Sequence, residues 1–383
     1  MPRTWRERKQ NLGRSHCNIF VLAEMLLALR GHHNVERATS RSCNQDPLRM
    51  MTGHMSGKSS RKSLTQPHER LSKFADARRC ISPALKVQSP SSCIANANSY
   101  SDKIPLNDGN FMPIIGLGVY RMKPGNETTS SVLAALKAGY RMIDTSQTYE
   151  NEADVAEAIR ASGIPREEIF IQSKLGQEWH GYETAYWQII NSISKMGLDY
   201  LDCFLINTPY GELLQETYDA LVQLRKEGHL KSIGVANFGV KHLELFEESC
   251  LPTPAVNQIE MHPYIYQERT SLLEYCKSKG ILVQAYGSLF GGSEKALSDK
   301  RLKAVCELYP NKTAQQILLR WALQKGCQVI PKSVQEQRML DNLDIFDFQL
   351  SVSDMATLSS WSPKYCQKIV GYWNPMDDSV WHR

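Results

Sequence analysis

The sequence lacks paired cysteines. Its ten cysteines are scattered, none forms a C-x-x-C pair, and no group of cysteine and histidine residues has the spacing of a zinc site. This distribution predicts reduced thiols without disulfides or a bound metal, and it is typical of a reducing compartment.

A membrane-spanning run is also missing. The apolar segment at residues 19–29 has eleven residues and contains Glu24, whereas a helix that crosses a bilayer needs about 20 apolar residues. With 42% hydrophobic and 22% charged residues, the composition is that of an ordinary soluble globular protein.

Acidic residues are scarce at the start of the chain. Residues 1–100 contain 17 Lys and Arg against 6 Asp and Glu, while residues 101–383 contain 28 against 34. Because the first segment also has poor apolar periodicity, we expect a disordered basic leader or tail at 1–100 and one folded domain at 101–383. The leader could be a mitochondrial transit peptide, or absent if translation starts at Met50, Met51 or Met55. Nucleic-acid binding is disfavoured because no motif or interleaved aromatic residues accompany the basic charge.

From residue 104 onward, strand-like and helix-like runs alternate. A β-hairpin comes first, with Asp108-Gly109 as its turn signal. Eight strands and eight helices follow, and this alternation predicts an α/β fold, the (β/α)8 or TIM barrel. We expect strands at 115–120, 141–145, 169–174, 203–207, 232–237, 256–260, 282–286 and 328–332, and two extra helices at 298–309 and 353–361.

An open doubly wound sheet is the alternative fold. It normally carries G-x-G-x-x-G between its first strand and first helix. Here Gly116-Leu117-Gly118 lacks the third glycine and opens no helix, so the barrel is favoured.

Reactive side chains end neighbouring predicted strands. Asp144 ends the second strand, Tyr149 lies in the loop after it, and Lys174 ends the third. In a barrel, these ends meet at one rim, where active sites form. A nearby ammonium should lower the pKa of the phenol from about 10, so that Tyr149 could donate a proton near neutral pH. A structural Lys–Asp pair would explain two of these residues but not the tyrosine.

The last predicted strand leads into a basic group. Lys332 and Ser333 leave the strand, and Arg338 and Asn342 share one face of the next helix. A Lys and an Arg beside a helix N-terminus could hold a phosphomonoester such as an adenosine 2′-phosphate. A salt bridge from Arg338 to an acidic residue of the same helix is the alternative.

Three other strand ends carry amide or aromatic groups. Asn237 and Gln258 could bond a carboxamide, and Tyr286 could stack on a flat ring. Each of these residues, taken alone, is more often structural.

Together these stretches resemble the aldo-keto reductase family, from about residue 104 to 361. The resemblance is carried by GLGVYRM, KAGYRMIDTSQTYENEADVAEAI, GLDYLDCFLINTP, GVANF, NQIEMHP and IPKSVQEQRMLDN. It implies a (β/α)8 barrel that binds NADPH without a Rossmann domain. It also implies reduction of aldehydes or ketones by hydride transfer from the nicotinamide.

The resemblance also implies a role for each candidate residue. Tyr149 would be the general acid, with Lys174 as its pKa modulator and Asp144 as the support for Lys174. The 2′-phosphate and adenine would be held by Lys332, Ser333, Arg338 and Asn342, the carboxamide by Asn237 and Gln258, and the nicotinamide ring by Tyr286. We expect a small carbonyl substrate in a pocket lined by Tyr120, Trp179, Asn207 and the aromatic tail at 372–375. We also expect the protein to be a monomer. It should lie in the cytoplasm, or in mitochondria if the leader is a transit peptide.

Two positions depart from the family pattern. Asn207 stands where the family usually has a catalytic histidine, and Ala236 replaces a serine that contacts the carboxamide. An amide can still donate a hydrogen bond to a carbonyl oxygen, but it cannot relay a proton. The potassium-channel β subunits of this family resemble the chain in having Asn there. The alternative function is therefore a slow or inactive NADPH-binding module with a regulatory or redox-sensing role.

Overall fold

The computed structural model describes residues 90–211 and 213–361. The chain divides into two units, Met1–Ile81 and Ser82–Arg383, and the whole first unit lies outside the described residues. Most of the predicted basic leader, and the aromatic tail at 372–375, also lie outside them. The last part of the expected leader is helical rather than disordered, because helix α2 (Pro90–Ala95) packs beside strand β1 (Lys103–Pro105) and buries Ile94 completely.

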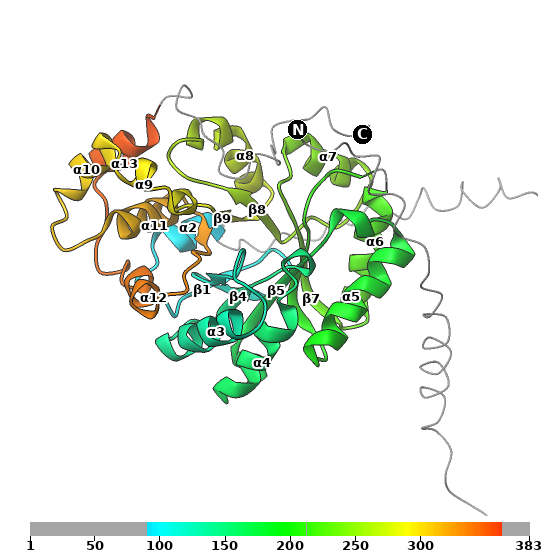
Figure 1. The fold of residues 1–383 in the computed structure, drawn as a ribbon. Coiled ribbons are helices and arrows are strands. Elements are labelled where there is room, and N and C mark those ends of the chain that lie inside the picture. The colour runs from blue at the N-terminus through cyan, green and yellow to red at the C-terminus, as the bar shows by residue number, and fades with distance from the viewer. Residues whose placement is uncertain (1–89, 212, 362–383) are drawn as a thin grey trace, which may run out of the picture. The chain divides into compact units, whose positions relative to one another are not determined.

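Eight parallel strands occupy the centre of the second unit, and helices surround them (Figure 1). Each strand pairs with the next strand along the chain, and nearly all strand residues are buried, as expected for parallel strands covered by helices. The (β/α)8 fold predicted from the sequence is therefore confirmed. The strands are β3 (Leu117–Gly118), β4 (Met142–Asp144), β5 (Phe170–Leu175), β6 (Leu201–Ile206), β7 (Leu230–Ala236), β8 (Val256–Glu260), β9 (Leu282–Tyr286) and β10 (Gln328–Val329).

The first and last strands meet and close the barrel. Ile115 forms a parallel bridge with Val329, and the Gly118 N–H donates to the Pro331 carbonyl at 3.2 Å. A Cβ atom on Gly118 would lie 2.9 Å from the Ile330 carbonyl oxygen, so glycine permits this close approach. Strands β3 and β10 are shorter than the predicted runs at 115–120 and 328–332, because regular pairing is limited at this seam.

A helix follows each strand, and in the described part of the chain three more helices besides α2 lie outside the repeat. The predicted extra helix at 298–309 is shorter in the structure, where α10 spans Lys300–Cys306 and a separate short helix, α9, precedes the predicted run. The Asp299 side chain caps the start of α10 by accepting from the Arg301 N–H at 2.9 Å. The helices of the repeat are α3 (Asn126–Ala138), α4 (Glu152–Ser162), α5 (Tyr182–Met196), α6 (Leu214–Lys226), α7 (Val240–Glu248), α8 (Tyr266–Ser278), α11 (Ala314–Gln324) and α12 (Glu336–Leu343), and the others are α9 (Glu294–Leu297), α10 (Lys300–Cys306) and α13 (Val352–Ser359).

Local sequence signals set several helix ends. Helix α5 ends at Gly197, whose φ of 63° is left-handed and whose N–H bonds back to the last turn. Helix α11 begins with a capping box, in which Thr313 and Gln316 bond each other's backbone N–H groups. None of the helices in the described part of the chain has the length and apolar character needed to cross a bilayer.

The hairpin of β1 and β2 (Phe111–Pro113) lies at the N-terminal ends of the strands. Asn110 Nδ2 donates to the Lys231 carbonyl at 3.0 Å, near the start of β7, and Asn107 Nδ2 donates to the Pro254 carbonyl at 2.9 Å, just before β8. The hairpin therefore covers this end of the barrel, and the opposite end carries the candidate site.

Candidate active site

The C-terminal ends of β4 and β5 bring the predicted catalytic group together. Asp144 is the last residue of β4, and Lys174 is the second-last residue of β5. A short 3-10 helix, η3 (Gln147–Tyr149), places Tyr149 above them, and the Ser146 side chain caps the start of η3 by accepting from the Thr148 N–H.

Lys174 is the centre of this group. Its Nζ lies 2.7 and 2.8 Å from the two Asp144 carboxylate oxygens, 2.8 Å from the Thr145 carbonyl and 3.3 Å from the Tyr149 hydroxyl. The ammonium and the carboxylate are both nearly inaccessible to solvent. Short contacts therefore fix the orientation of the Lys174–Asp144 ion pair. The same ammonium also contacts the phenol of Tyr149.

The pKa of the phenol differs from the sequence-based expectation. Burial raises the pKa of Tyr149 well above 10. The negative charge of Asp144 raises this pKa further, and electrostatic repulsion from Tyr120 acts in the same direction. Burial also lowers the pKa of Lys174, although Asp144 opposes this effect. The expected lowering of the Tyr149 pKa by Lys174 is therefore wrong for this structure, because burial is the largest cause of the shift and it raises the pKa. The neutral phenol is the stable form, and it is a proton donor.

A second group of polar side chains lies beside the first. Asn237 Nδ2 donates to the Asn207 carbonyl at 2.9 Å, and the Tyr286 hydroxyl donates to Asn237 Oδ1 at 2.8 Å. Asn237 has a φ of 65°, a left-handed conformation that asparagine tolerates better than most residues. Asn207 and Asn237 directly follow β6 and β7, and Tyr286 ends β9, so this group lies at the same end of the barrel as Asp144 and Lys174.

Gln258 points into the barrel interior. Its Nε2 donates to Asp144 Oδ1 at 2.9 Å and to Gln284 Oε1 at 2.5 Å. Sequence reasoning missed Gln284 and also Gln172, whose Nε2 contacts the same two oxygens. The only sequence signal was an uncharged polar residue inside each of two buried strands.

The basic group lies at the start of α12. Lys332 and Arg338 are exposed, and neither takes part in an ion pair within 90–211 or 213–361. The N-terminus of α12 has no side-chain cap. Ser333 is bonded to the Gln335 backbone, and Asn342 is buried beside Tyr140. Two cations and uncapped N–H groups fit a phosphate, and the alternative of an intrahelical salt bridge at Arg338 is not formed.

Two aromatic residues border the catalytic group. The Tyr120 ring lies 5.0 Å from the Tyr149 ring between centroids, and 44% of Tyr120 is exposed. Trp179 is half-buried at the end of η5 (Gln177–Trp179), directly after β5. Tyr120 can therefore contact a ligand that reaches the Tyr149 hydroxyl, and Trp179 lies at the same end of the barrel.

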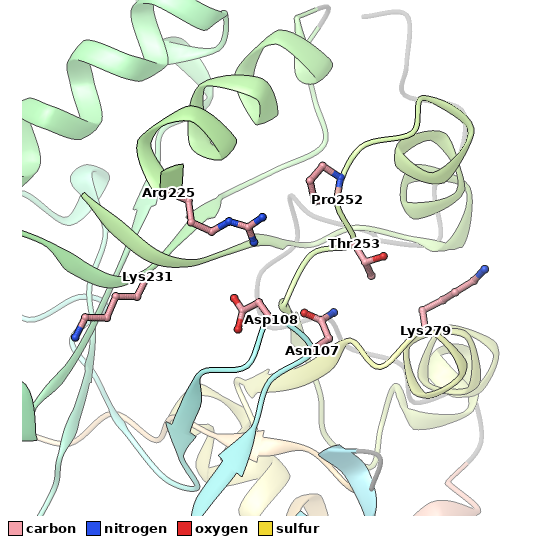
Figure 2. A pocket seen from close by; sticks show the side chains of 7 residues that line it. All are labelled: Asn107, Asp108, Arg225, Lys231, Pro252, Thr253 and Lys279. Atoms are coloured by element: carbon pink, nitrogen blue, oxygen red, sulfur yellow. The ribbon is translucent and has the colours of Figure 1, made fainter. Parts of the chain in front are cut away.

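A concavity lies at the opposite end of the barrel, beside the hairpin (Figure 2). Its Arg225 and Lys279 come from the last turn of α6 and the C-cap of α8, where cations stabilise helix dipoles. Lys231 and Lys279 extend away from each other in Figure 2 and pair with Asp202 and Glu247. These cations are explained without a ligand. The described residues contain no cluster of three or more metal-binding side chains.

The fold and the site define the class of protein, a (β/α)8 barrel with a buried Asp–Lys pair beside a tyrosine at the C-terminal ends of its strands. The Aldo/keto reductase family matches residues 115–362. A glyoxal reductase from Bacillus subtilis (strain 168) is 44% identical over 257 residues, which cover 67% of this chain and 91% of that protein. The chain belongs to the aldo/keto reductase family.

Solved structures agree with this membership. A crystal structure of an aldo/keto reductase from Brucella melitensis matches with a TM-score of 0.64 and 40% identity, and covers 68% of this chain and 98% of that one. An aldo-keto reductase from Bombyx mori in complex with NADP matches with a TM-score of 0.65 and 32% identity, and covers 70% of this chain and 95% of that one. Carbonyl reduction is the chemistry that this family membership supports.

Proposed function

We propose that the protein reduces small aldehydes or ketones to alcohols with NADPH, and that Tyr149 is the general acid. The observation that carries the proposal is the single Lys174 ammonium, which contacts both the Asp144 carboxylate and the Tyr149 hydroxyl. When bound, the cofactor supplies a hydride to the carbonyl carbon. The neutral Tyr149 phenol donates its proton to the carbonyl oxygen, and Lys174 stabilises the phenolate that remains.

The cofactor would lie between the basic group and the catalytic group. Lys332 and Arg338, with the N-terminus of α12, would hold the 2′-phosphate, and Ser333 and Asn342 would shape that site. The carboxamide would contact Asn237 and Gln258, and the Tyr286 ring would stack on the nicotinamide. The Bombyx mori relative forms a complex with NADP, and this supports the choice of cofactor.

The substrate would enter beside Tyr120 and Trp179. The Asn207 amide would donate a hydrogen bond that orients the carbonyl, in place of the usual imidazole. The name of the Bacillus subtilis relative supports a small dicarbonyl as a substrate. Asn207 also favours the second candidate function, a slow NADPH-binding sensor, because the amide cannot relay a proton.

A single-turnover experiment tests the proposal. Protein saturated with NADPH is mixed with excess methylglyoxal, and nicotinamide absorbance is followed in the wild type, Tyr149→Phe and Tyr218→Phe. Tyr218 is a matched control, since its buried hydroxyl has no hydrogen-bond partner among the described residues. Oxidation that is lost only in Tyr149→Phe supports the reductase. NADPH that stays reduced for many minutes in the wild type favours the sensor.

A further inference from the structure

The barrel interior contains four buried glutamines, one on each of four strands. Gln172 lies on β5, Gln258 on β8, Gln284 on β9 and Gln328 on β10, and none is more than 4% exposed. Barrel interiors are usually filled by branched apolar side chains. A buried amide is unfavourable unless its polar atoms are bonded, so the partners of these amides indicate their purpose.

Three of the glutamines form one network with Asp144. Gln172 Nε2 donates to Asp144 Oδ1 at 2.7 Å and to Gln284 Oε1 at 2.6 Å. Gln258 Nε2 donates to the same two oxygens at 2.9 and 2.5 Å. Three strands lie between β5 and β9 in the sheet, so the Gln172–Gln284 bond crosses the barrel.

The direction of the Gln172 amide is set by the carboxylate. Turning the amide over would place Gln172 Oε1 against Asp144 Oδ1, an acceptor against an acceptor. In the observed direction, Gln172 Oε1 is buried and has no hydrogen-bond partner in the described part of the chain. An unsatisfied buried carbonyl calls for an explanation, and the Asp144 contact supplies one.

The two Asp144 oxygens have unequal surroundings. Oδ1 accepts from Lys174 Nζ, Gln172 and Gln258, whereas Oδ2 accepts from Lys174 Nζ. The two amide donors hold the carboxylate in the plane that faces Lys174. They also share its negative charge, so less of that charge acts on the ammonium and the phenol.

We propose that Gln172 and Gln284 are positioning residues, which orient and moderate the Asp144 carboxylate and thereby set the strength of Tyr149 as an acid. This inference rests on the role proposed above for Tyr149. Gln172 reaches Asp144 directly, while Gln284 aligns Gln172 and Gln258 by accepting from both amides.

The groups that face Tyr149 fix the direction of the effect. They are Lys174 on β5, Asp144 on β4, Tyr120 after β3 and Tyr286 on β9. The charge of Asp144 disfavours the phenolate. Removing the Gln172 donor leaves more of that charge unscreened and draws Lys174 away from its 3.3 Å contact with the phenol. Both changes make Tyr149 a weaker acid.

The test compares Gln172→Met with Gln328→Met. Methionine keeps most of the side-chain volume and removes the amide. Gln328 is a matched control, because it is equally buried but its Nε2 contacts the Pro113 carbonyl and Met142 Sδ instead of Asp144. Alcohol oxidation requires the Tyr149 phenolate as a base, so its rate is measured against pH in all three proteins, together with kcat and the KM for NADPH in reduction.

Below the pKa of Tyr149, alcohol oxidation by Gln172→Met should be about three- to tenfold slower than by the wild type at each pH, as expected if that pKa rises by roughly half a unit to one unit. Its kcat for reduction should fall about three- to tenfold, with little change in KM. Gln328→Met should keep the wild-type profile. A second variant, Gln284→Met, should shift the profile in the same direction as Gln172→Met and provides the test if Gln172→Met does not fold. An unshifted profile, or equal shifts in Gln172→Met and Gln328→Met, would overturn the proposal.

A spectroscopic readout separates this inference from the proposed reaction. Protein labelled with ¹³Cζ-tyrosine gives a Tyr149 signal that is identified by its absence in Tyr149→Phe. That signal should move in Gln172→Met and stay in place in Gln328→Met, even if no carbonyl is reduced. A signal that is unchanged in Gln172→Met would refute the positioning role, while a moved signal without turnover would refute only the reductase.

Discussion

The Lys174 ammonium lies within 2.8 Å of both carboxylate oxygens of Asp144, and both side chains are almost fully buried. A buried charge that loses its partner is strongly unfavourable, by about 3–5 kcal/mol. We therefore expect Asp144→Asn and Lys174→Met each to lower the free energy of unfolding by about that amount. Urea unfolding at neutral pH measures the loss.

The double variant distinguishes a mutual pair from two separate contributions. Asp144→Asn with Lys174→Met leaves no unpaired charge, so it should be more stable than the sum of the two single losses indicates. Additive losses would show that the two residues stabilise the barrel independently. All three variants should lose carbonyl reduction, because each one removes the ammonium or its orientation at Tyr149.

The exposed cations near α12 lead to a prediction about cofactor choice. Arg338→Ala should weaken NADPH binding about 10- to 100-fold, since it removes a charge-assisted contact to a phosphate. NADH lacks the 2′-phosphate, so its affinity should change little. Fluorescence titration with each cofactor measures both effects. Arg225→Ala, which removes a guanidinium at the other end of the barrel, is the control, and equal losses for NADPH and NADH in Arg338→Ala would reject the phosphate site.

The side chain at position 207 leads to a prediction about rate. The Asn207 carbonyl is held by Asn237, but no described hydrogen bond restrains the Asn207 side chain, so a histidine can be introduced without breaking a bond. If the missing imidazole limits proton transfer, Asn207→His should raise kcat for reduction by about tenfold or more. Steady-state kinetics at pH 7 provide the measurement. A fall or no change would indicate a pocket adapted to the amide.

The sequence was sufficient to predict the barrel and the convergence of Asp144, Tyr149 and Lys174. Both follow from a general rule, since parallel strands in a barrel present their C-terminal ends at one rim. The strand ends could be located because Asp144 closes the short buried run of β4, and Lys174 lies one residue before the end of the buried strand β5.

Two features of the site could not be predicted in this way. The Gln172–Gln284 contact joins strands on opposite sides of the barrel, and neither sequence spacing nor strand order reports which side chains meet across the interior. Burial is the largest cause of the raised pKa of Tyr149, and the Asp144 charge acts in the same direction. The sequence shows that an ammonium is present, but it does not show how much water the fold removes from the phenol.

A buried histidine leads to the last prediction. His180 lies between η5 and α5, and both its ring nitrogens are buried without a hydrogen-bond partner among the described residues. Burial lowers the pKa of His180 from 6.5 to about 4, although Glu178 opposes the shift. The unfolded chain therefore binds a proton between these pH values while the folded chain does not. The stability that the neutral imidazole contributes is complete above pH 6.5 and is lost as the pH falls towards 4.

His180→Phe removes this titration. Between pH 7 and pH 4.5, the wild type should lose about 2 kcal/mol more unfolding free energy than the variant, after allowance for the partial exposure of the ring. Urea unfolding of both proteins at the two pH values measures the difference. Comparing the losses cancels other acid-titrating groups, such as the buried Glu152 carboxyl, whose pKa is also shifted by burial. Equal losses in the two proteins would mean that His180 is protonated as readily in the folded state as in the unfolded state.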